Sequence, residues 1–347
     1  MYPFYLGIDL HLKRSYVVLM NAEGEVLEKQ QLKNSEMASY LDEKVPKETY
    51  AVMEATRNWP FFYDLLGEHV ERVELAHAKE VRSIATAAVK TDRIDATVLA
   101  HLARLNFLPI AYAAPKEIRD LRQYLRCRDW LVGQRCRAKN RVHAVLAGYN
   151  LASPVTDLFG RSGREWLSDV VEQGLRPPAQ QVITEMLALI QQMEIQIKKL
   201  TKEIPLPEAL KPKAELLMSM PGVGKLVAAT ILAEIGEISR FDSAKALCNW
   251  AGLTPRVHQS DRILRHGRIS KQGSRYLRTA MVCAATTACR VSPRWSRVFE
   301  RMATRSGWRA AKVAVARRLL TVVYYMLKRN QPYDEKYEQR RRVVQGA

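Results

Sequence analysis

The sequence lacks any long apolar run. No segment approaches the roughly 18 consecutive apolar residues that a membrane-spanning helix needs. Its first residues, MYPFYLGIDLH, also lack the basic start and the extended apolar segment of a signal peptide. We therefore expect no membrane span and a cytoplasmic location.

Cysteine is scarce, with five residues in a chain of 347. No two of them form a CxxC pair, and none stands at metal-ligand spacing from a histidine. This pattern favours free thiols in a reducing compartment over disulfides or a cysteine–histidine metal site. The cysteines are Cys127, Cys136, Cys248, Cys283 and Cys289.

Acidic residues are too few to balance the basic ones, and the excess positive charge is concentrated in particular segments of the chain. The chain has 55 Lys and Arg against 36 Asp and Glu, a formal net charge of +19. Residues 1–114 hold 13 basic and 16 acidic residues, whereas 115–150 hold nine and three, and 256–347 hold 22 and five. A slightly acidic first part followed by strongly basic segments predicts a polyanionic partner, most simply nucleic acid.

Residues 1–114 have the pattern of an α/β domain. The apolar runs FYLGIDL, SYVVLMN and EVLEKQQL predict three successive strands, and TYAVMEA and VELAHA predict two more. Helices are expected over SEMASYLDEKV, WPFFYDLLGEHV and DRIDATVLAHLARL. This order fits a mixed sheet covered by helices.

The rest of the chain is predicted to be mainly helical. Residues 115–210 contain two long amphipathic patterns, which indicate a helical hairpin or coiled coil that serves as linker and oligomerisation segment. The proline-rich PLPEALKP marks a boundary, so 211–347 is expected to form a third, α-helical domain with a basic tail. Its turn Pro221-Gly-Val-Gly224 resembles a helix-hairpin-helix turn, in which amides such as those of Gly222 and Gly224 hold a phosphate. An ordinary turn between packed helices is an equal interpretation.

Four carboxylates stand where strands end or a helix starts. Asp9 and Glu54 close strand patterns, and Asp92 and Asp95, three residues apart, share a face at the start of a helix. Each has a plain explanation alone: a helix N-terminus for Asp92, a strand end for Glu54, a pair with Arg93 or Lys90 for Asp95. If the four converge, their repulsion and desolvation favour a bound Mg²⁺, an ion with hard oxygen ligands. Two such ions about 3.5–4 Å apart stabilise the attacking and leaving oxygens of phosphoryl transfer.

Two blocks of motifs resemble a known family. GIDLH, VMEATRNW and VKTDRIDATVLAHLAR resemble the RuvC-like domain of the DEDD transposases of bacterial insertion sequences of the one-hundred-and-ten type, the bridge-RNA-guided recombinases. PGVGKLVAATILAEIGEISRF, NWAGLTPRVHQS and GRISKQGSRYLR resemble the C-terminal domain of that family. The resemblance extends from Tyr5 to about Arg329. It implies an RNase H-like (RuvC-like) α/β domain, a coiled-coil segment and a mainly α C-terminal transposase domain.

The resemblance also implies the catalytic residues. It places the metal-binding acids, for Mg²⁺ or Mn²⁺, on Asp9, Glu54, Asp92 and Asp95. By the motif G-x-I-S-K-x-G it places the family's serine nucleophile, which links covalently to DNA, on Ser270. Ser274 and Ser260 rank second and third, because the chain departs from the family pattern near both. The chemistry of Ser270 alone favours a helix N-cap followed by a phosphate-binding basic helix, and the resemblance reverses that preference.

Clusters of basic residues are the candidate nucleic-acid contacts. Those around Ser270 would neutralise a scissile phosphate, and those on the first long helix fit RNA binding, with Tyr124 and Trp130 either stacking on bases or packing in the protein. Residues 295–318 form another candidate surface. The named contacts are Arg122, Arg126, Arg137, Lys139, Gly222, Gly224, Arg265, Arg268, Lys271, Arg275 and Arg278.

The resemblance predicts an RNA-guided DNA recombinase that moves its own insertion element by cleavage, a serine-linked intermediate, strand exchange and rejoining. Its partners would be target and donor DNA, a guide RNA and further copies of the chain, as a dimer or tetramer. Two alternatives are a metal-dependent RuvC-like nuclease or junction resolvase without the covalent serine, and a non-catalytic nucleic-acid-binding scaffold.

Overall fold

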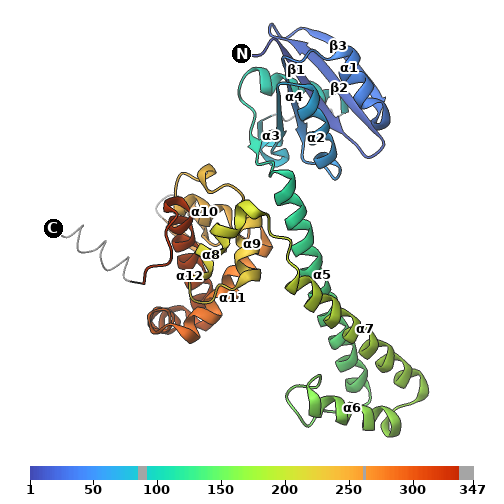
Figure 1. Cartoon of the computed structure of the whole chain (residues 1–347), viewed down its shortest axis with the longest axis vertical. Helices are drawn as coiled ribbons and strands as arrows, with labels where there is room; N and C mark the ends of the chain where they lie inside the picture. The colour runs from blue at the N-terminus through green and yellow to red at the C-terminus, as the bar shows by residue number, and fades with distance from the viewer. Residues whose placement is uncertain (85–91, 261–262, 336–347) are drawn as a thin grey trace, which may run out of the picture. The chain divides into compact units, whose positions relative to one another are not determined.

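The computed structural model describes residues 1–84, 92–260 and 263–335; the side chains of 92, 93 and 257–266 lie outside this description. The chain divides into two compact units, Met1–Ala114 and Pro115–Ala347. Each is described by itself (Figure 1).

The first unit is built on a mixed sheet of six strands. Their order is β3-β2-β1-β4-β5-β6. The pairs β1–β2, β2–β3 and β5–β6 are antiparallel, and β1–β4 and β4–β5 are parallel. The strands are β1 (Phe4–Leu10), β2 (Arg14–Asn21), β3 (Val26–Lys33), β4 (Thr49–Glu54), β5 (Arg72–Ala76) and β6 (Ile110–Ala111).

Helices cover both faces of this sheet. On one face, α1 and α2 pack on the even-numbered side chains of β1, among them Leu6 and Ile8. On the other face, α4 packs its Leu99 and Ala100 in a second cluster that contains Tyr5 and Val52. The helices are α1 (Met37–Lys44), α2 (Trp59–His69), α3 (Ala78–Ile84) and α4 (Asp92–Arg104). The period-two alternation of the buried strands therefore assigns each side chain to one of two cores.

Gly7 brings α4 unusually close to β1. A Cβ added at Gly7 would lie 2.0 Å from the Ala96 carbonyl oxygen and 2.8 Å from the Ala100 nitrogen. Any larger residue there would push the helix backbone off the sheet. This glycine thus sets the distance between α4 and the strand that carries Asp9.

The second unit begins with an antiparallel helical hairpin. The Tyr124 hydroxyl, near the start of α5, donates to the Leu200 carbonyl (3.1 Å), near the end of α7, and Lys139 further along α5 lies 3.7 Å from Glu194. Figure 1 shows these two helices side by side. The hairpin helices are α5 (Lys116–Gly148) and α7 (Pro177–Lys202), joined through α6 (Arg161–Gly174).

The remaining helices surround one large core. Trp295 lies in it, 1% exposed, with its Nε1 donating to the Tyr333 hydroxyl at 3.1 Å. The turn before α9 packs on α11: Gly222 has φ +84°, and a Cβ there would lie 2.2 Å from the Ala284 carbonyl oxygen. The elements are α8 (Lys211–Met218), α9 (Lys225–Ile235), α10 (Ala244–Trp250), β7 (Pro255–Ser260), β8 (Ile263–Ile269), α11 (Arg275–Val291) and α12 (Pro293–Arg329). Within the described residues, none of the helices is long and apolar enough to cross a membrane.

The expected fold class is confirmed: a mixed sheet with helices, long helices, then a mainly helical region. Several elements were missed: α3 and β6 in the first unit, and α6 and the β7–β8 hairpin in the second. Helix α6 follows the breaker residues Pro154 and Gly160, where only an irregular insert was expected, and the β7–β8 hairpin interrupts a region expected to be helical. Neither RVHQS nor ILRHGRI alternates polar and apolar residues, so the sequence carries no period-two signal for the hairpin.

We predict that Gly7→Ala lowers the free energy of unfolding of the first unit by about 1–3 kcal/mol, because the added methyl overpacks the β1–α4 contact. Hydrogen exchange of peptides from β1 and α4 measures this loss. The control is Gly133→Ala on an exposed face of α5, where nothing lies within 4 Å and the change should be neutral or stabilising. Unchanged protection of β1 and α4 in Gly7→Ala would show that the contact is not tight.

Candidate active site

Asp9 and Glu54 lie on neighbouring parallel strands at the same end of the sheet. The β1–β4 register pairs Ile8 with Met53, so the two acids follow one step later along both strands. Ile8 and Met53 point into the α1–α2 core. By alternation, the acids therefore face the α4 side of the sheet. Both are half-buried.

Helix α4 points its N-terminal end toward these acids. At its other end, the Arg104 Nη1 donates to the Ala22 carbonyl (3.3 Å). Ala22 directly follows the end of β2, where Asn21 pairs with Phe4 at the far end of β1 from Asp9. The first turns of α4, with half-buried Asp95, consequently lie at the Asp9 end. Asp92 begins the helix, and its side chain lies outside the described residues.

A histidine that sequence reasoning missed joins this site. His11 Nε2 lies 3.2 Å from Asp9 Oδ2, with the Asp9 side chain only 14% exposed. The His11 carbonyl accepts from the side-chain amides of Asn34 (2.8 Å) and Asn58 (3.0 Å). Asn58 follows β4, so it ties the loop after β1 to the loop after β4. The sequence signal for this contact was the spacing of Asp9 and His11, because residues two apart in an extended chain point to the same side.

The donor set suits a hard divalent cation. Carboxylates from two strands and one helix lie at one end of one sheet face, and oxygen ligands of this kind are what Mg²⁺ prefers. Within the described residues, which leave out the Asp92 side chain, no group of three His, Cys, Asp or Glu side chains forms a ready-made metal site. The arrangement thus places three of the four predicted acids on one face, and the fourth falls outside the description.

Ser270 lies on a short loop between β8 and α11. Its backbone N–H donates to the Thr254 carbonyl (2.9 Å), and its own carbonyl accepts from Arg256 Nη2 (3.3 Å). Its side chain is half-buried, and among the described residues its Oγ makes only a long contact, 3.5 Å, with the Gln272 N–H. The backbone is therefore held while the hydroxyl is almost unengaged.

Close backbone contacts fix this loop. A Cβ added at Gly273 would lie 2.0 Å from the Trp250 carbonyl oxygen, and one at Gly252 would lie 2.2 Å from the Gln272 carbonyl oxygen. Both glycines have positive φ, and Lys271 takes the left-handed region with φ 56°. A non-glycine residue persists there only where its surroundings hold it. The loop that carries Ser270 is thus pre-shaped.

Arg278 fastens the same loop from inside. Its Nη1 donates to the carbonyls of Ala251 (3.1 Å), Gln272 (2.7 Å) and Gly273 (3.1 Å). Burial lowers the pKa of this guanidinium. The sequence predicts a nucleic-acid contact for Arg278, and the structure shows this side chain bonded to three carbonyls of its own chain.

The three candidate serines differ in their surroundings. Ser274 is the N-cap of α11, and its Oγ accepts from the Leu277 N–H at 3.2 Å. The interpretation of Ser270 as the cap of that helix is therefore wrong. Ser260 lies in β7, and its side chain lies outside the described residues.

Some of the basic residues of α5 are bonded to other helices of the same unit, and others face solvent. Arg122 Nη2 donates to the Glu234 carbonyl (3.2 Å) at the end of α9, and Arg126 holds the Glu234 carboxylate with two bonds of 3.1 and 2.9 Å. Tyr124 bonds to α7, so it packs in the hairpin, whereas Trp130 is 57% exposed. Arg122 and Arg126 thus fasten α5 to α9, a different role from the predicted RNA contact.

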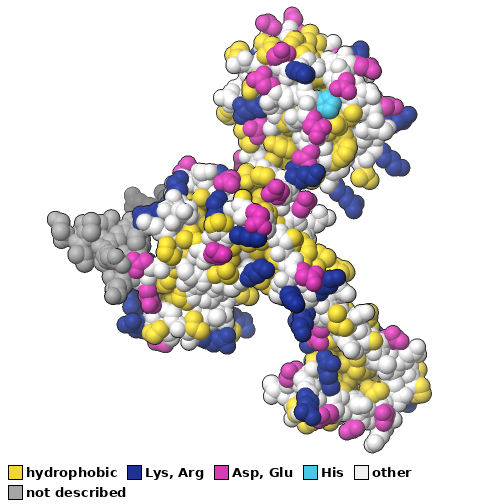
Figure 2. All heavy atoms as spheres, in the orientation of Figure 1, with side chains coloured by type: hydrophobic (Ala, Val, Ile, Leu, Met, Phe, Trp, Pro, Cys, Tyr) yellow, Lys and Arg dark blue, Asp and Glu magenta, His cyan; other side chains and the backbone are white. Residues whose placement is uncertain are grey.

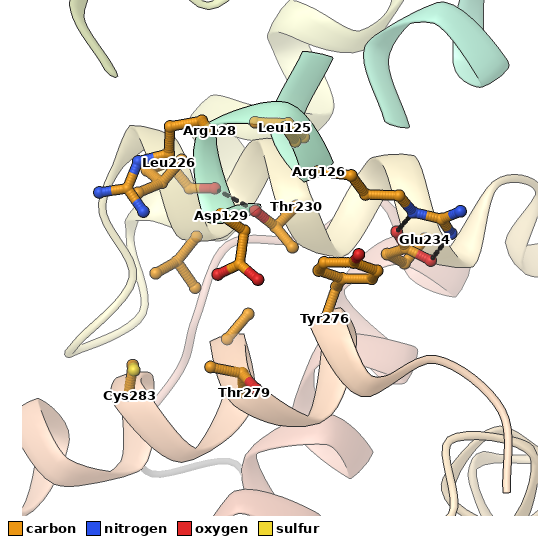
Figure 3. Close-up of a pocket in the computed structure, with 12 residues that line it drawn as sticks. Leu125, Arg126, Arg128, Asp129, Leu226, Thr230, Glu234, Tyr276, Thr279 and Cys283 are labelled. Atoms are coloured by element: carbon orange, nitrogen blue, oxygen red, sulfur yellow. Dashed lines mark hydrogen bonds and ion pairs between the residues drawn. The ribbon is translucent and has the colours of Figure 1, made fainter. Parts of the chain in front are cut away.

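A cavity of about 250 Å³ lies beside this fastening, between α5, α9 and α11. Figure 3 shows the Arg126–Glu234 pair at one side and the Asp129 carboxylate directed into the space. The Arg126 guanidinium also lies 4.9 Å from the centre of the Tyr276 ring. The lining residues are Leu125, Arg126, Arg128, Asp129, Leu226, Val227, Thr230, Glu234, Tyr276, Thr279, Ala280 and Cys283.

Other predicted contacts face solvent. Arg137, Arg268, Lys271 and Arg275 are exposed. Lys and Arg side chains follow the α5–α7 hairpin in Figure 2. Lys139 is half-buried between Glu194 and the Phe159 ring, Gly224 caps α9 with open space around it, and the Arg265 side chain lies outside the described residues.

The sheet order, its mixed strand directions and the acids at one end define an RNase H-like domain, here followed by a long helix and a mainly helical region. A family model for the DEDD transposase domain of IS110 type, described as Transposase, matches residues 6–151. A second model, described as Transposase IS116/IS110/IS902 family, matches residues 214–300.

Two relatives match over nearly the whole chain, and a third matches over part of it. A "Probable family 20 transposase" of Pseudomonas aeruginosa is 23% identical over 339 residues, 94% of this chain and 98% of that one. The "Transposase for insertion sequence element IS1111A" of Coxiella burnetii is 24% identical over 337 residues, 94% and 90% of the two chains. A "Pilin gene-inverting protein" of Moraxella bovis is 33% identical over 150 residues, 42% and 46% of the two chains.

The chain belongs to the IS116/IS110/IS902 family of transposases. It is a DNA-binding phosphoryl-transfer enzyme that moves an insertion element. Its DEDD domain implies catalysis with a divalent metal.

We predict that Glu234→Ala lowers the free energy of unfolding of the second unit by about 1–2 kcal/mol, since it leaves the half-exposed Arg126 guanidinium without its carboxylate. Urea unfolding measures the change. Glu215→Ala, at an exposed position on α8, is the matched control and should have little effect. Equal midpoints for the two variants would contradict a stabilising role for the Arg126–Glu234 pair.

Proposed function

We propose that this transposase is an RNA-guided recombinase that cuts and rejoins DNA through a serine-linked intermediate, with Ser270 as the nucleophile. The observation that carries the proposal is the half-buried, almost unengaged Ser270 hydroxyl on a loop held by close backbone contacts. A pre-shaped nucleophile needs little reorganisation when the phosphate arrives.

The proposed reaction conserves the number of phosphodiester bonds. Ser270 Oγ bonds to the scissile phosphorus, the bond to the leaving DNA oxygen breaks, and that oxygen receives a proton. A DNA hydroxyl from the partner strand then displaces Ser270 and restores the serine hydroxyl. The exposed cations Arg268, Lys271 and Arg275 stand near Ser270 in sequence and would neutralise the phosphate charge.

The acidic site completes the proposal. We assign Asp9, Glu54, Asp92 and Asp95 as ligands of Mg²⁺ or Mn²⁺, because three of them share one end of one sheet face. When bound, the metal would supply positive charge to phosphate oxygens. His11, 3.2 Å from Asp9, would orient that carboxylate.

Guide RNA and self-association are parts of the same proposal. The exposed basic residues Arg137 of α5 and Arg268 of β8 are proposed nucleic-acid contacts, together with the glycine turn before α9. We propose 115–210 as the oligomerisation segment, between domains 1–114 and 211–347. Supporting it, the hairpin exposes apolar side chains that its own core leaves uncovered: Trp130 (57%), Leu189 (47%) and Ile195 (54%).

We predict that Ser270→Ala abolishes the covalent protein–DNA adduct and lowers recombination at least about 10³-fold, because Ser270 supplies the attacking oxygen in the proposed reaction. Denaturing gels of protein incubated with element-end DNA and copurified RNA detect the adduct. Ser274→Ala is the matched control: it should keep the adduct and lose about 1 kcal/mol of stability with the α11 cap. Full recombination by Ser270→Ala would instead favour a nuclease without a covalent intermediate.

We predict that Asp9→Asn and Glu54→Gln each weaken Mn²⁺ binding at least about 10-fold, because each removes a charged oxygen ligand. Calorimetry of the intact protein measures the affinity apart from activity. Glu43→Gln, exposed on α1 on the other face of the sheet, should bind as the wild type does. Unaltered Mn²⁺ uptake in both acid variants would remove these residues from the metal site.

A further inference from the structure

Helix α12 contains a sharp irregularity at Gly307. This residue has φ 77° and ψ 157°, so it separates a first helical stretch from a second. All seven residues from Thr304 to Ala310 are exposed. The tryptophan directly after the break, Trp308, is 57% exposed.

The surroundings of Trp308 are strongly cationic. Residues 293–318 contain eight Lys and Arg and one acidic residue, Glu300. Glu300 accepts a bond from the Ser296 hydroxyl (2.8 Å). Among the described residues, no carboxylate is paired with Arg305, Arg309 or Lys312. In Figure 2, Lys and Arg side chains gather at the edge of the helical region beside α12.

Two of these cations flank the indole ring. The Lys312 Nζ lies 4.9 Å from the ring centre, and the Arg309 guanidinium lies 5.4 Å from it. Lys312 is one helical turn beyond Trp308, so both project from the same side of α12. An aromatic face bordered by unpaired cations matches the two parts of a nucleotide, a flat base and a charged phosphate.

A role for Trp308 in packing does not explain this placement. The other tryptophan of α12, Trp295, fills the core, and its N–H is satisfied by Tyr333. Trp308 instead leaves more than half of a large apolar surface in water. Such exposure marks a contact surface, and the neighbouring charges make an apolar protein partner a poor match.

We propose that Trp308 is a stacking platform for an unpaired base of single-stranded DNA, with Arg305, Arg309 and Lys312 binding the adjoining phosphates. Duplex bases are already stacked on each other, so a single exposed ring gains most from a strand that has been opened. DNA strands are opened during the cutting and rejoining that this family performs. The proposal is independent of Ser270 and of the metal site.

The chemistry around the ring favours DNA over RNA. Selective recognition of RNA uses its ribose 2′-hydroxyl, and because the Arg and Lys donors here are assigned to phosphates, its reader would be a hydroxyl, amide or carboxylate side chain. The hydroxyls of Thr304 and Ser306 donate to carbonyls of their own helix, Glu300 at 3.0 Å and Met302 at 3.0 Å. Between Thr304 and Lys312 the sequence has no carboxylate or amide side chain.

The test is binding of the full-length protein to a fluorescent oligothymidylate, followed by anisotropy. Trp308→Ala should weaken binding about 5- to 100-fold, and Trp308→Phe should restore most of it, because stacking needs only an aromatic ring. Phe61→Ala, an aromatic with 64% exposure on the acidic first unit, is the matched control and should bind like the wild type. Arg305→Ala should make the slope of log binding constant against log salt concentration shallower by about one, because one phosphate contact is lost. Trp308→Ala, which removes only stacking, should leave this slope unchanged.

Further readouts separate the alternatives. Addition of oligothymidylate should quench tryptophan fluorescence in the wild type and less in Trp308→Phe. Wild-type affinity of Trp308→Ala for the DNA would overturn the proposal. The proposal would also be overturned if Trp308→Ala lost affinity for a single-stranded RNA of matched sequence but not for the DNA. An altered oligomeric state of Trp308→Ala with unchanged DNA binding would overturn it as well. Because the side chain is exposed, unchanged thermal unfolding of the variant is expected.

Discussion

The close approach of α4 to β1 is the constraint on which the acidic site depends. Gly7 leaves room for the Ala96 carbonyl where any other residue would place a Cβ at 2.0 Å. Because the helix lies against the strand and runs opposite to it, Asp9 of β1, Glu54 of β4 and the first turns of α4 lie toward one end of one face. If the four predicted acids converge there, they require compensating positive charge.

The serine loop is organised by the same kind of contact. At Gly252 and Gly273, backbone approaches backbone more closely than a side chain permits, and Arg278 bridges the carbonyls on both sides. In both units, close backbone contacts at glycines fix the positions of the strand, helix or loop that carries the proposed functional side chains. The residues that fix the backbone, Gly7, Gly252, Gly273 and Arg278, are therefore different from the residues proposed to take part in the chemistry.

The sequence was sufficient for the sheet because strand alternation is a local pattern, and the same pattern generates the prediction of the acid site. Strand alternation places Asp9 and Glu54 at strand ends, as the structure has them, and three-residue spacing predicts that Asp92 and Asp95 share one helix face. The β7–β8 hairpin and the roles of Arg122, Arg126 and Arg278 could not be found in this way. An arginine that fastens two helices and one that contacts nucleic acid have the same local sequence context, and only the tertiary partner, here Glu234 or a loop carbonyl, distinguishes them.

Anomalous diffraction from crystals of the protein soaked with Mn²⁺ tests the central claim most directly, since it locates the ion without reference to activity. The account predicts a peak at the carboxyl ends of β1 and β4, within ligand distance of Asp9, Glu54 and the first turn of α4. A fully bound ion elsewhere, with the Asp9 and Glu54 carboxylates directed to solvent, would contradict it.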